Sequence, residues 1–145
     1  MKKSVFFLTL IISVVLVVSC GSMSGGKVTD DTFRAIYDKY KDGDGLILDG
    51  AQRYIVKDGD TLVDIARSFY GDGFYYPVIL LASRDVVLDM DEIQPGMELT
   101  IPNLQRNLSE RKATIKGVML DCAVAEDTRN RSGTADGLRD LANTL

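Results

Sequence analysis

The side chains of this 145-residue sequence that could act in catalysis are mainly carboxylates, because the chain contains no histidine. Without histidine there is no usual general base, no Ser–His or Cys–His pair, and none of the commonest zinc ligand. The acids of the central stretch could be taken for a glycosidase pair: Asp60, Asp64, Glu92 and Glu98. Nothing in the sequence places any two of them across a cleft, as glycoside hydrolysis requires. We therefore expect a protein that is not an enzyme and that needs no cofactor.

A cluster of aspartates before residue 50 resembles part of a calcium-binding EF-hand loop, in which Asp-x-Asp-Gly is followed by an apolar residue. The cluster consists of Asp38, Asp42, Asp44 and Asp49 around Gly45. With the glycine at the turn, however, Tyr40 would stand at the first ligand position and Ala51 at the twelfth. Both acidic anchors of the loop are therefore missing, and we favour a solvated acidic turn over a metal site.

The first of two cysteines, Cys20, lies at the end of a segment typical of secretion. Lys2 and Lys3 precede an apolar run at 5–18, as in the charged and hydrophobic parts of a signal peptide. The run is too short for a spanning helix, since crossing the hydrocarbon core takes about twenty apolar residues. The small residues beside Cys20 resemble the lipobox of bacterial lipoproteins. We expect a lipoprotein signal peptide at 1–19.

The lipobox resemblance implies that a diacylglyceryl group is attached to the Cys20 sulfur and that the chain is cut before this residue. It also implies acylation of the new amino group, for example with palmitate. Two or three acyl chains anchor a protein stably, because each buried methylene contributes about 0.8 kcal/mol. An ordinary signal peptide with an incidental cysteine, or an uncleaved anchor, is the alternative.

The residues after Cys20 are rich in glycine and serine, which predicts a flexible tether at 20–29. If Cys20 is lipidated, Cys122 has no disulfide partner within the chain. We expect Cys122 to be a small buried apolar residue on a helix, with a reactive or intermolecular thiol as the alternative.

The charge of the chain argues against nucleic acid as a partner. The chain has 21 acidic and 17 basic residues and a formal net charge of −4 at pH 7. Cleavage before Cys20 would remove Lys2 and Lys3 and make the mature protein still more acidic. Such a chain offers no broad basic surface.

The stretch 30–52 predicts an amphipathic helix and a connector. Apolar and aromatic residues follow two aspartates at helical spacing: Phe33, Ile36, Tyr37 and Tyr40. We expect this helix to end at Gly43 and to pack on the core. Residues 46–48 then form a buried connector to the next strand.

The central stretch, 53–102, begins with the pattern of a strand and a capped helix. The β-branched and aromatic residues at 54–56 end in a turn at Asp58 and Gly59. Thr61 can cap a helix together with Asp64. The apolar face of this helix has helical spacing: Leu62, Ile65, Ala66 and Phe69. Glycines at 71 and 73 end it.

The second half of the central stretch predicts another helix and strand. Pro77 suits the first turn of a helix at 76–82, although continuous apolarity there leaves a buried strand open. Pro95 and Gly96 form a turn, after which apolar and polar residues alternate from 97 to 101. The predicted order is therefore strand, helix, helix, strand.

This stretch resembles the LysM domain through three motifs in the right order: Y-x-V-x-x-GDTL-x-x-IA-x-x-x-YGD, then YP-x-I, then I-x-PG-x-x-L-x-IP. The resemblance implies an α+β fold, a βααβ module in which a two-stranded antiparallel sheet packs against two helices. We expect additional helices to flank the module at both ends.

The LysM resemblance implies a shallow groove that binds glycans containing N-acetylglucosamine, such as peptidoglycan. Two loops would form it: Gly59, Asp60, Thr61 and Leu62, and, on the other side, Ile93, Gln94, Pro95, Gly96 and Met97. Backbone groups of tight turns can pair with acetamido groups, while nearby apolar side chains contact the methyl group. The same residues also have structural interpretations, since Thr61 can be only a cap and Leu62 only core.

The sequence departs from the LysM pattern in the second loop. Ser83 and Arg84 follow the second helix where many family members have asparagine, and Met90 precedes Asp91 where many have proline. We therefore expect the second loop to differ in shape from that of many relatives.

The last segment, 103–145, predicts two amphipathic helices. Ser109 can cap a helix that begins near Glu110, and residues 127–133 are loop-like. Thr134 can cap a final helix whose stripe is Leu138, Leu141 and Leu145. Packing of this segment on the LysM core and docking on another protein both remain open.

Together these observations predict a lipoprotein of the bacterial cell envelope, anchored at Cys20 to the outer or inner membrane or the cell surface, that binds peptidoglycan without catalysis. It would link the membrane to the cell wall. The alternative is an adaptor that recruits or regulates a wall enzyme through its terminal helices, which an exposed leucine stripe would favour.

Overall fold

The computed structural model describes residues 29–40 and 45–145. Four features of the sequence lie outside these ranges: the predicted signal peptide, Cys20, the predicted tether except Thr29, and the aspartates at 42 and 44. Within the described ranges, none of the helices has the length and apolar character needed to cross a membrane.

The sheet consists of two antiparallel strands, β1 (Gln52–Ile55) and β2 (Glu98–Ile101). Tyr54 pairs with Leu99 in the register of the ladder. The alternation predicted for the second strand is confirmed, because Leu99 and Ile101 are buried and Glu98 and Thr100 are not. The inner face of the sheet therefore lies on the core.

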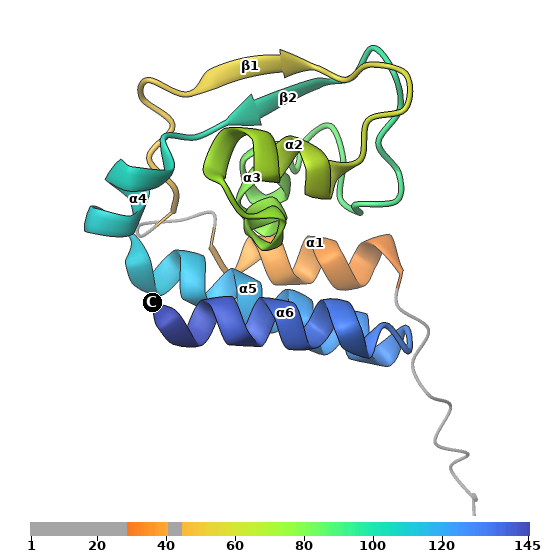
Figure 1. The fold of residues 1–145 in the computed structure, drawn as a ribbon, viewed down its shortest axis with the longest axis vertical. Coiled ribbons are helices and arrows are strands. Elements are labelled where there is room, and N and C mark those ends of the chain that lie inside the picture. Colours follow the sequence, from red (N-terminus) through yellow and green to blue (C-terminus); the bar gives the residue numbers. More distant parts are fainter. Residues whose placement is uncertain (1–28, 41–44) are drawn as a thin grey trace, which may run out of the picture.

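Two helices follow β1 and lie under the sheet: α2 (Leu62–Tyr70) and α3 (Tyr76–Ala82), with the 3-10 turn η1 (Gly73–Tyr75) between them (Figure 1). Gly71 ends α2 in the left-handed conformation, with a φ of 84°. Every residue of α3 before Ala82 is buried, which explains why its sequence shows no amphipathic period. The predicted α+β fold with a βααβ module is confirmed.

The remaining helices lie beneath the module and along one side of it (Figure 1). They are α1 (Asp30–Asp38), α4 (Leu104–Glu110), α5 (Lys112–Thr128) and α6 (Ser132–Thr144). In Figure 1, α1, α5 and α6 lie side by side below α2 and α3, and α4 leads from β2 down to α5. The prediction of flanking helices at both ends is confirmed.

The helix starts predicted for the last segment were wrong. Asn103, not Ser109, caps the first helix there, since its side chain accepts a hydrogen bond from Arg106 N at 3.0 Å. Ser109 lies inside α4, where its hydroxyl donates to the carbonyl of Gln105. The helical conformation is interrupted at Arg111, and α5 begins one residue later.

The final loop and cap were also predicted wrongly. The α5 helix continues to Thr128 and α6 begins at Ser132, so Thr134 lies within the first turn of α6. Most of the predicted loop is therefore helical. The connection turns at Asn130, whose φ of 61° is the left-handed conformation that asparagine tolerates.

The terminal helices and the βααβ module share one core. The main buried cluster combines Leu62, Leu80 and Leu99 of the module with Phe33 of α1 and Leu138 of α6. Leu141 and Leu145 pack partly buried against a second buried cluster. The leucine stripe of the last helix is therefore packed within the protein and is not an open surface.

A buried asparagine side chain is hydrogen-bonded to the connector that precedes β1. The Asn107 side chain is fully buried, accepts from Ile47 N at 2.8 Å and donates to the Ile47 carbonyl at 3.0 Å. It thus supplies both hydrogen bonds that a neighbouring strand would make. The connector is less buried than predicted, since Leu48 is 44% exposed.

Two glycines of α6 provide a test of this packing. A Cβ at Gly137 would overlap the ring of Phe74, whereas nothing lies within 4 Å of a Cβ at Gly133. Gly137→Ala is expected to lower the free energy of unfolding by about 1 to 3 kcal/mol through overpacking. Gly133→Ala should leave it unchanged or raise it by up to about 1 kcal/mol, because alanine favours helix. Urea denaturation measures both, and equal effects of the two changes would contradict the close contact between α6 and η1.

Candidate functional site

The two predicted loops lie side by side because the ladder of the sheet continues into them. Val56, just after β1, donates to the Met97 carbonyl at 2.9 Å and accepts from Gly96 N at 2.8 Å. The turn after β1 and the turn before β2 are thus held against the same residue. We call residues 59–62 and 93–97 together the two-turn site.

Both turns have a glycine with positive φ at the third position. In the first turn Asp60 N donates to the Lys57 carbonyl at 3.2 Å, and Gly59 has a φ of 82°. In the second turn Met97 N donates to the Gln94 carbonyl at 3.1 Å, and Gly96 has a φ of 90°. Pro95 precedes Gly96, as type II turns favour. Both glycines are exposed and nothing lies within 4 Å of an added Cβ, so a ligand can approach the backbone closely.

Asp60 holds the first turn together rather than facing a ligand. Its Oδ2 accepts from Lys57 N at 2.8 Å and from the Tyr54 hydroxyl at 2.7 Å. These hydrogen bonds, the backbone one first, keep the pKa of Asp60 below its ordinary value. The carboxylate therefore stays ionised and fixes the turn.

Thr61 and Leu62 form the start of α2. The Thr61 hydroxyl oxygen accepts from Asp64 N at 3.1 Å, so the predicted cap is present. The Leu62 side chain is fully buried in the main core. Of the first loop, therefore, the exposed Gly59 backbone is open to a ligand, since its N–H and carbonyl have no hydrogen-bond partner among the described residues. Thr61 is exposed, but its hydroxyl is bonded to Asp64.

The second loop offers apolar and amide groups beside the turn. Ile93 and Met97 are half-buried against the core, while Gln94, Pro95 and Gly96 are exposed. The Gln94 amide has no hydrogen-bond partner among the described residues. Half-buried apolar side chains beside free backbone and amide groups suit a ligand that is both polar and partly apolar.

An ion-pair network that the sequence did not reveal anchors the second loop to the turn between α5 and α6. Arg129 N–H groups donate to both carboxylate oxygens of Asp89, one of them at 3.0 Å. Arg131 forms an ion pair with Asp91. Arg129 also lies over the ring of Phe33, 4.6 Å from its centroid. Because the partners are 40 residues apart, no local sequence pattern marks them.

The acids of this network have opposite pKa shifts. Burial alone would raise the pKa of Asp89, but the hydrogen bonds from Arg129 and from Asp91 N outweigh it and lower the pKa. Glu126 is fully buried and its oxygens have no hydrogen-bond partner within the described chain, although Arg129 and Arg131 lie within 3.7 Å. Its burial raises its pKa.

The carboxylates do not form a catalytic pair. Asp64 bonds to Arg67, Glu98 forms an ion pair with Arg53, and Asp60 is held in its turn. Glu92 has a raised pKa, through partial burial first and then the neighbouring Asp30 and Asp89. Among the residues that the structure describes, no three acidic, cysteine or histidine side chains are grouped as metal ligands would be. In the described part of the chain, these four carboxylates are therefore not paired with one another as an acid and a base would be.

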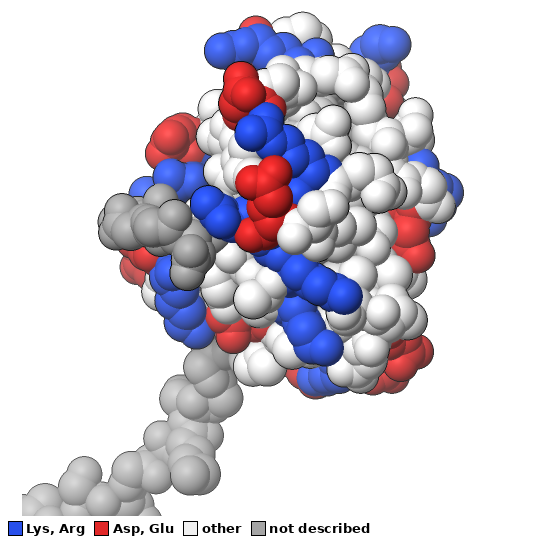
Figure 2. All heavy atoms as spheres, turned by 90° about the vertical axis from the view of Figure 1, so that its left-hand side faces the viewer, with Lys and Arg blue, Asp and Glu red and all other residues white. Residues whose placement is uncertain are grey.

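The face of the molecule that carries α4 does not concentrate positive charge (Figure 2). Figure 2 shows the face on which α4 lies, where lysine and arginine are interleaved with aspartate and glutamate. Such a face lacks the basic field that nucleic acid needs.

The fold and the two-turn site define a small βααβ module with two glycine turns at one end of its sheet. Residues 54–102 match the family model of the LysM domain. The chain is also 31% identical over 87 residues to the potassium binding protein Kbp of Escherichia coli O6:H1. No solved structure shows significant similarity to the chain.

These comparisons identify residues 54–102 as a LysM domain. The match to Kbp covers 60% of this chain and is longer than the LysM segment alone. It covers 52% of Kbp, so the chain spans about half the length of this curated relative.

Proposed function

We propose that the LysM domain binds glycans that contain N-acetylglucosamine, such as peptidoglycan, at the two-turn site and without catalysis. The observation that carries this proposal is the pair of glycine turns held side by side by Val56, within a segment that matches the LysM domain. The Gly59 N–H and carbonyl and the Gly96 carbonyl, which have no hydrogen-bond partner among the described residues, can pair with acetamido groups, and Ile93 and Met97 can contact their methyl groups.

We further propose that the protein is lipid-anchored at Cys20 in the bacterial cell envelope and links its membrane to the cell wall. The support for this is the signal-peptide pattern at 1–19, the lipobox resemblance and the glycine-rich segment that follows. Anchoring would compensate for a weak site, because it raises the effective concentration of the domain near the wall.

The similarity to a potassium binding protein raises potassium as a second candidate ligand. Thermal unfolding in KCl and in NaCl at equal ionic strength tests it, since a ligand that binds the native state raises the unfolding midpoint. A midpoint that rises only in KCl would support this candidate, and identical midpoints would exclude it at the concentrations used.

Pelleting with insoluble peptidoglycan tests the glycan proposal. The protein would lack residues 1–20, which leaves every described helix and strand in place. Gly59→Asn and Gly96→Asn should abolish pelleting, because each side chain projects into the site while asparagine tolerates positive φ. Gly71→Asn is the matched control, since Gly71 also has a positive φ and open space but ends α2 outside the site.

The glycan proposal predicts that the wild type and Gly71→Asn pellet equally and that both site variants stay in the supernatant. Far-UV circular dichroism would confirm that all four proteins are folded. Failure of the folded wild type to pellet, or undiminished pelleting of both site variants, would contradict the proposal.

A further inference from the structure

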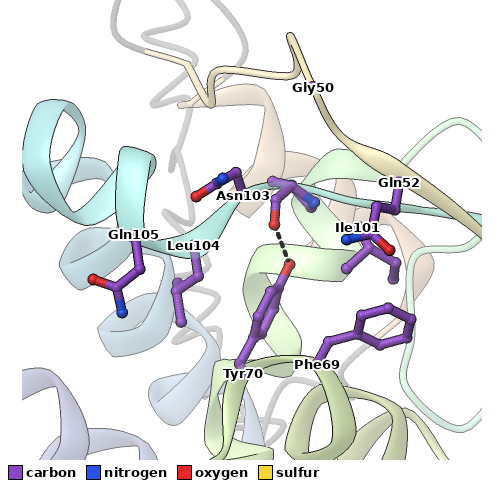
Figure 3. Close-up of a pocket in the computed structure, with 9 residues that line it drawn as sticks. Gly50, Gln52, Phe69, Tyr70, Ile101, Asn103, Leu104 and Gln105 are labelled. Carbon is purple, nitrogen blue, oxygen red and sulfur yellow. Dashed lines mark hydrogen bonds between the residues drawn. The ribbon is translucent and has the colours of Figure 1, made fainter.

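We propose that a glycan bound at the two-turn site continues along β1 and α2 into a second saccharide subsite beyond it. This inference rests on the proposed glycan binding and adds a location and a length to it. The second subsite is a pocket where β1 begins and β2 ends, which we call the strand-end pocket (Figure 3).

The strand-end pocket has a volume of about 230 Å³. Figure 3 shows that its walls come from three parts of the chain: the strands with Gln52 and Ile101, the end of α2 with Phe69 and Tyr70, and the start of α4 with Gln105. Of the described residues, none that lines it carries a charged side chain. An uncharged ligand is therefore favoured over a phosphate or a carboxylate.

Amide groups dominate the polar lining of this pocket. The Gln52 and Gln105 side chains have no hydrogen-bond partner in the described part of the chain. The Asn103 Oδ1 caps α4 by accepting from Arg106 N, which leaves its Nδ2 donors for a ligand. Amides can both donate and accept, as hydroxyl and acetamido groups require.

The pocket is fixed before any ligand arrives. The Tyr70 hydroxyl donates to the Pro102 carbonyl at 3.0 Å, which ties α2 to the end of β2 (Figure 3). The Asn103 cap orders the first turn of α4, which borders the pocket. A preformed site loses little conformational entropy on binding.

An exposed aromatic side chain joins the strand-end pocket to the two-turn site. Phe69 belongs to the apolar face predicted for α2, and its side chain is 37% exposed. It lines the strand-end pocket and also a smaller hollow of about 140 Å³ next to Tyr54 and Asp60. The Tyr54 and Phe69 rings meet edge to face, 5.6 Å apart.

The two hollows share Phe69, and both are lined by residues of β1 and α2. Asp60, which lines the smaller hollow, belongs to the two-turn site, and Gln52, which lines the strand-end pocket, lies at the start of β1. The strand between Gln52 and Val56 spans about 13 Å at roughly 3.3 Å per residue. Together the two hollows therefore suit a chain of sugar rings, whose apolar faces pack on exposed aromatic rings such as that of Phe69.

Binding of β-1,4-linked N-acetylglucosamine oligomers of increasing length, measured by calorimetry, tests this subsite. The wild-type protein without residues 1–20 should bind a hexamer about tenfold or more tightly than a dimer, a difference of about 1.4 kcal/mol. Gly50→Asn, which places a side chain at the pocket rim, and Gln105→Ala should remove most of this gain and leave dimer binding unchanged. Phe69→Ala should do the same, and Gly71→Asn serves as the control.

The outcomes separate the subsite from the proposed function. If folded Gly50→Asn and Gln105→Ala bind the dimer normally but no longer bind the hexamer more tightly, the subsite is supported. If the wild type binds the dimer and the hexamer equally well, or if all three pocket variants still bind the hexamer more tightly, the subsite is overturned and the two-turn site is unaffected. Absence of binding to any oligomer would overturn the proposed function and the subsite with it.

Discussion

Asp89→Asn is expected to lower the free energy of unfolding by about 2 to 4 kcal/mol, because it removes one partner of a buried ion pair. The side chains of Asp89 and Arg129 are only 8% and 16% exposed. Without the carboxylate, the guanidinium keeps only the more distant acids Asp91 and Glu126, each at 3.7 Å. Urea denaturation at pH 7 measures the loss.

The effect of Asp89→Asn should also depend on pH. The folded state lowers the pKa of Asp89, so its ionised form stabilises the protein above the ordinary pKa of about 3.9. This contribution disappears as the pH falls through the lowered value. The difference between wild type and variant should therefore shrink below about pH 4. Burial is the main cause of the raised pKa of Glu126, but the charge of Asp89 contributes to it, so the replacement should also let the pKa of Glu126 fall.

Asp85→Asn is the control for the ion-pair prediction. Asp85 lies in the same loop, is exposed, and forms no ion pair with a described residue. Its replacement should change the unfolding free energy by less than about 0.5 kcal/mol. Equal effects of Asp85→Asn and Asp89→Asn at pH 7 would contradict the anchoring of the second loop by Arg129.

Leu138→Ala is expected to lower the free energy of unfolding by about 2 to 5 kcal/mol, since Leu138 is fully buried in the main core. The same core contains Leu80 and Leu99 of the LysM domain. Unfolding should therefore remain a single transition at a lower urea concentration, with amide protection of both leucines lost in step. Leu141→Ala, in the same helix but only half-buried, should cost less.

A different result would separate the terminal helices from the LysM domain. If Leu138→Ala produced two transitions, with the amides of Leu80 and Leu99 protected through the first, α6 would be a separate folding unit. The shared core would then not stabilise the LysM domain.

The βααβ order was predictable because each element has its own local signal. Thr61 caps α2, Gly71 ends it, and Pro77 stands in the first turn of α3, each as predicted. The start of α4 was not predictable, because Asn103 and Ser109 can both cap a helix. Only the packing of Leu104 and Asn107 against the rest of the protein decides between them.

The two turns of the candidate site were predictable from glycine and proline, which restrict the backbone locally. The ion pair that supports the second turn was not predictable, because Asp89 and Arg129 lie in distant segments of the chain. The exposure of Phe69 was not predictable either. Its spacing matches the buried face of α2, yet the edge of a two-stranded sheet leaves its ring partly uncovered.

Binding of an N-acetylglucosamine glycan at the two-turn site of the LysM domain is tested by an NMR titration of the ¹⁵N-labelled protein, without residues 1–20, with the β-1,4-linked tetramer. We expect saturable chemical-shift changes of the amides of Gly59, Thr61, Gln94 and Gly96. The amide of Asn130, in the turn between α5 and α6, should keep its chemical shift. Chemical-shift changes confined to amides outside both turns, or no changes at high tetramer concentration, would contradict glycan binding at the two-turn site.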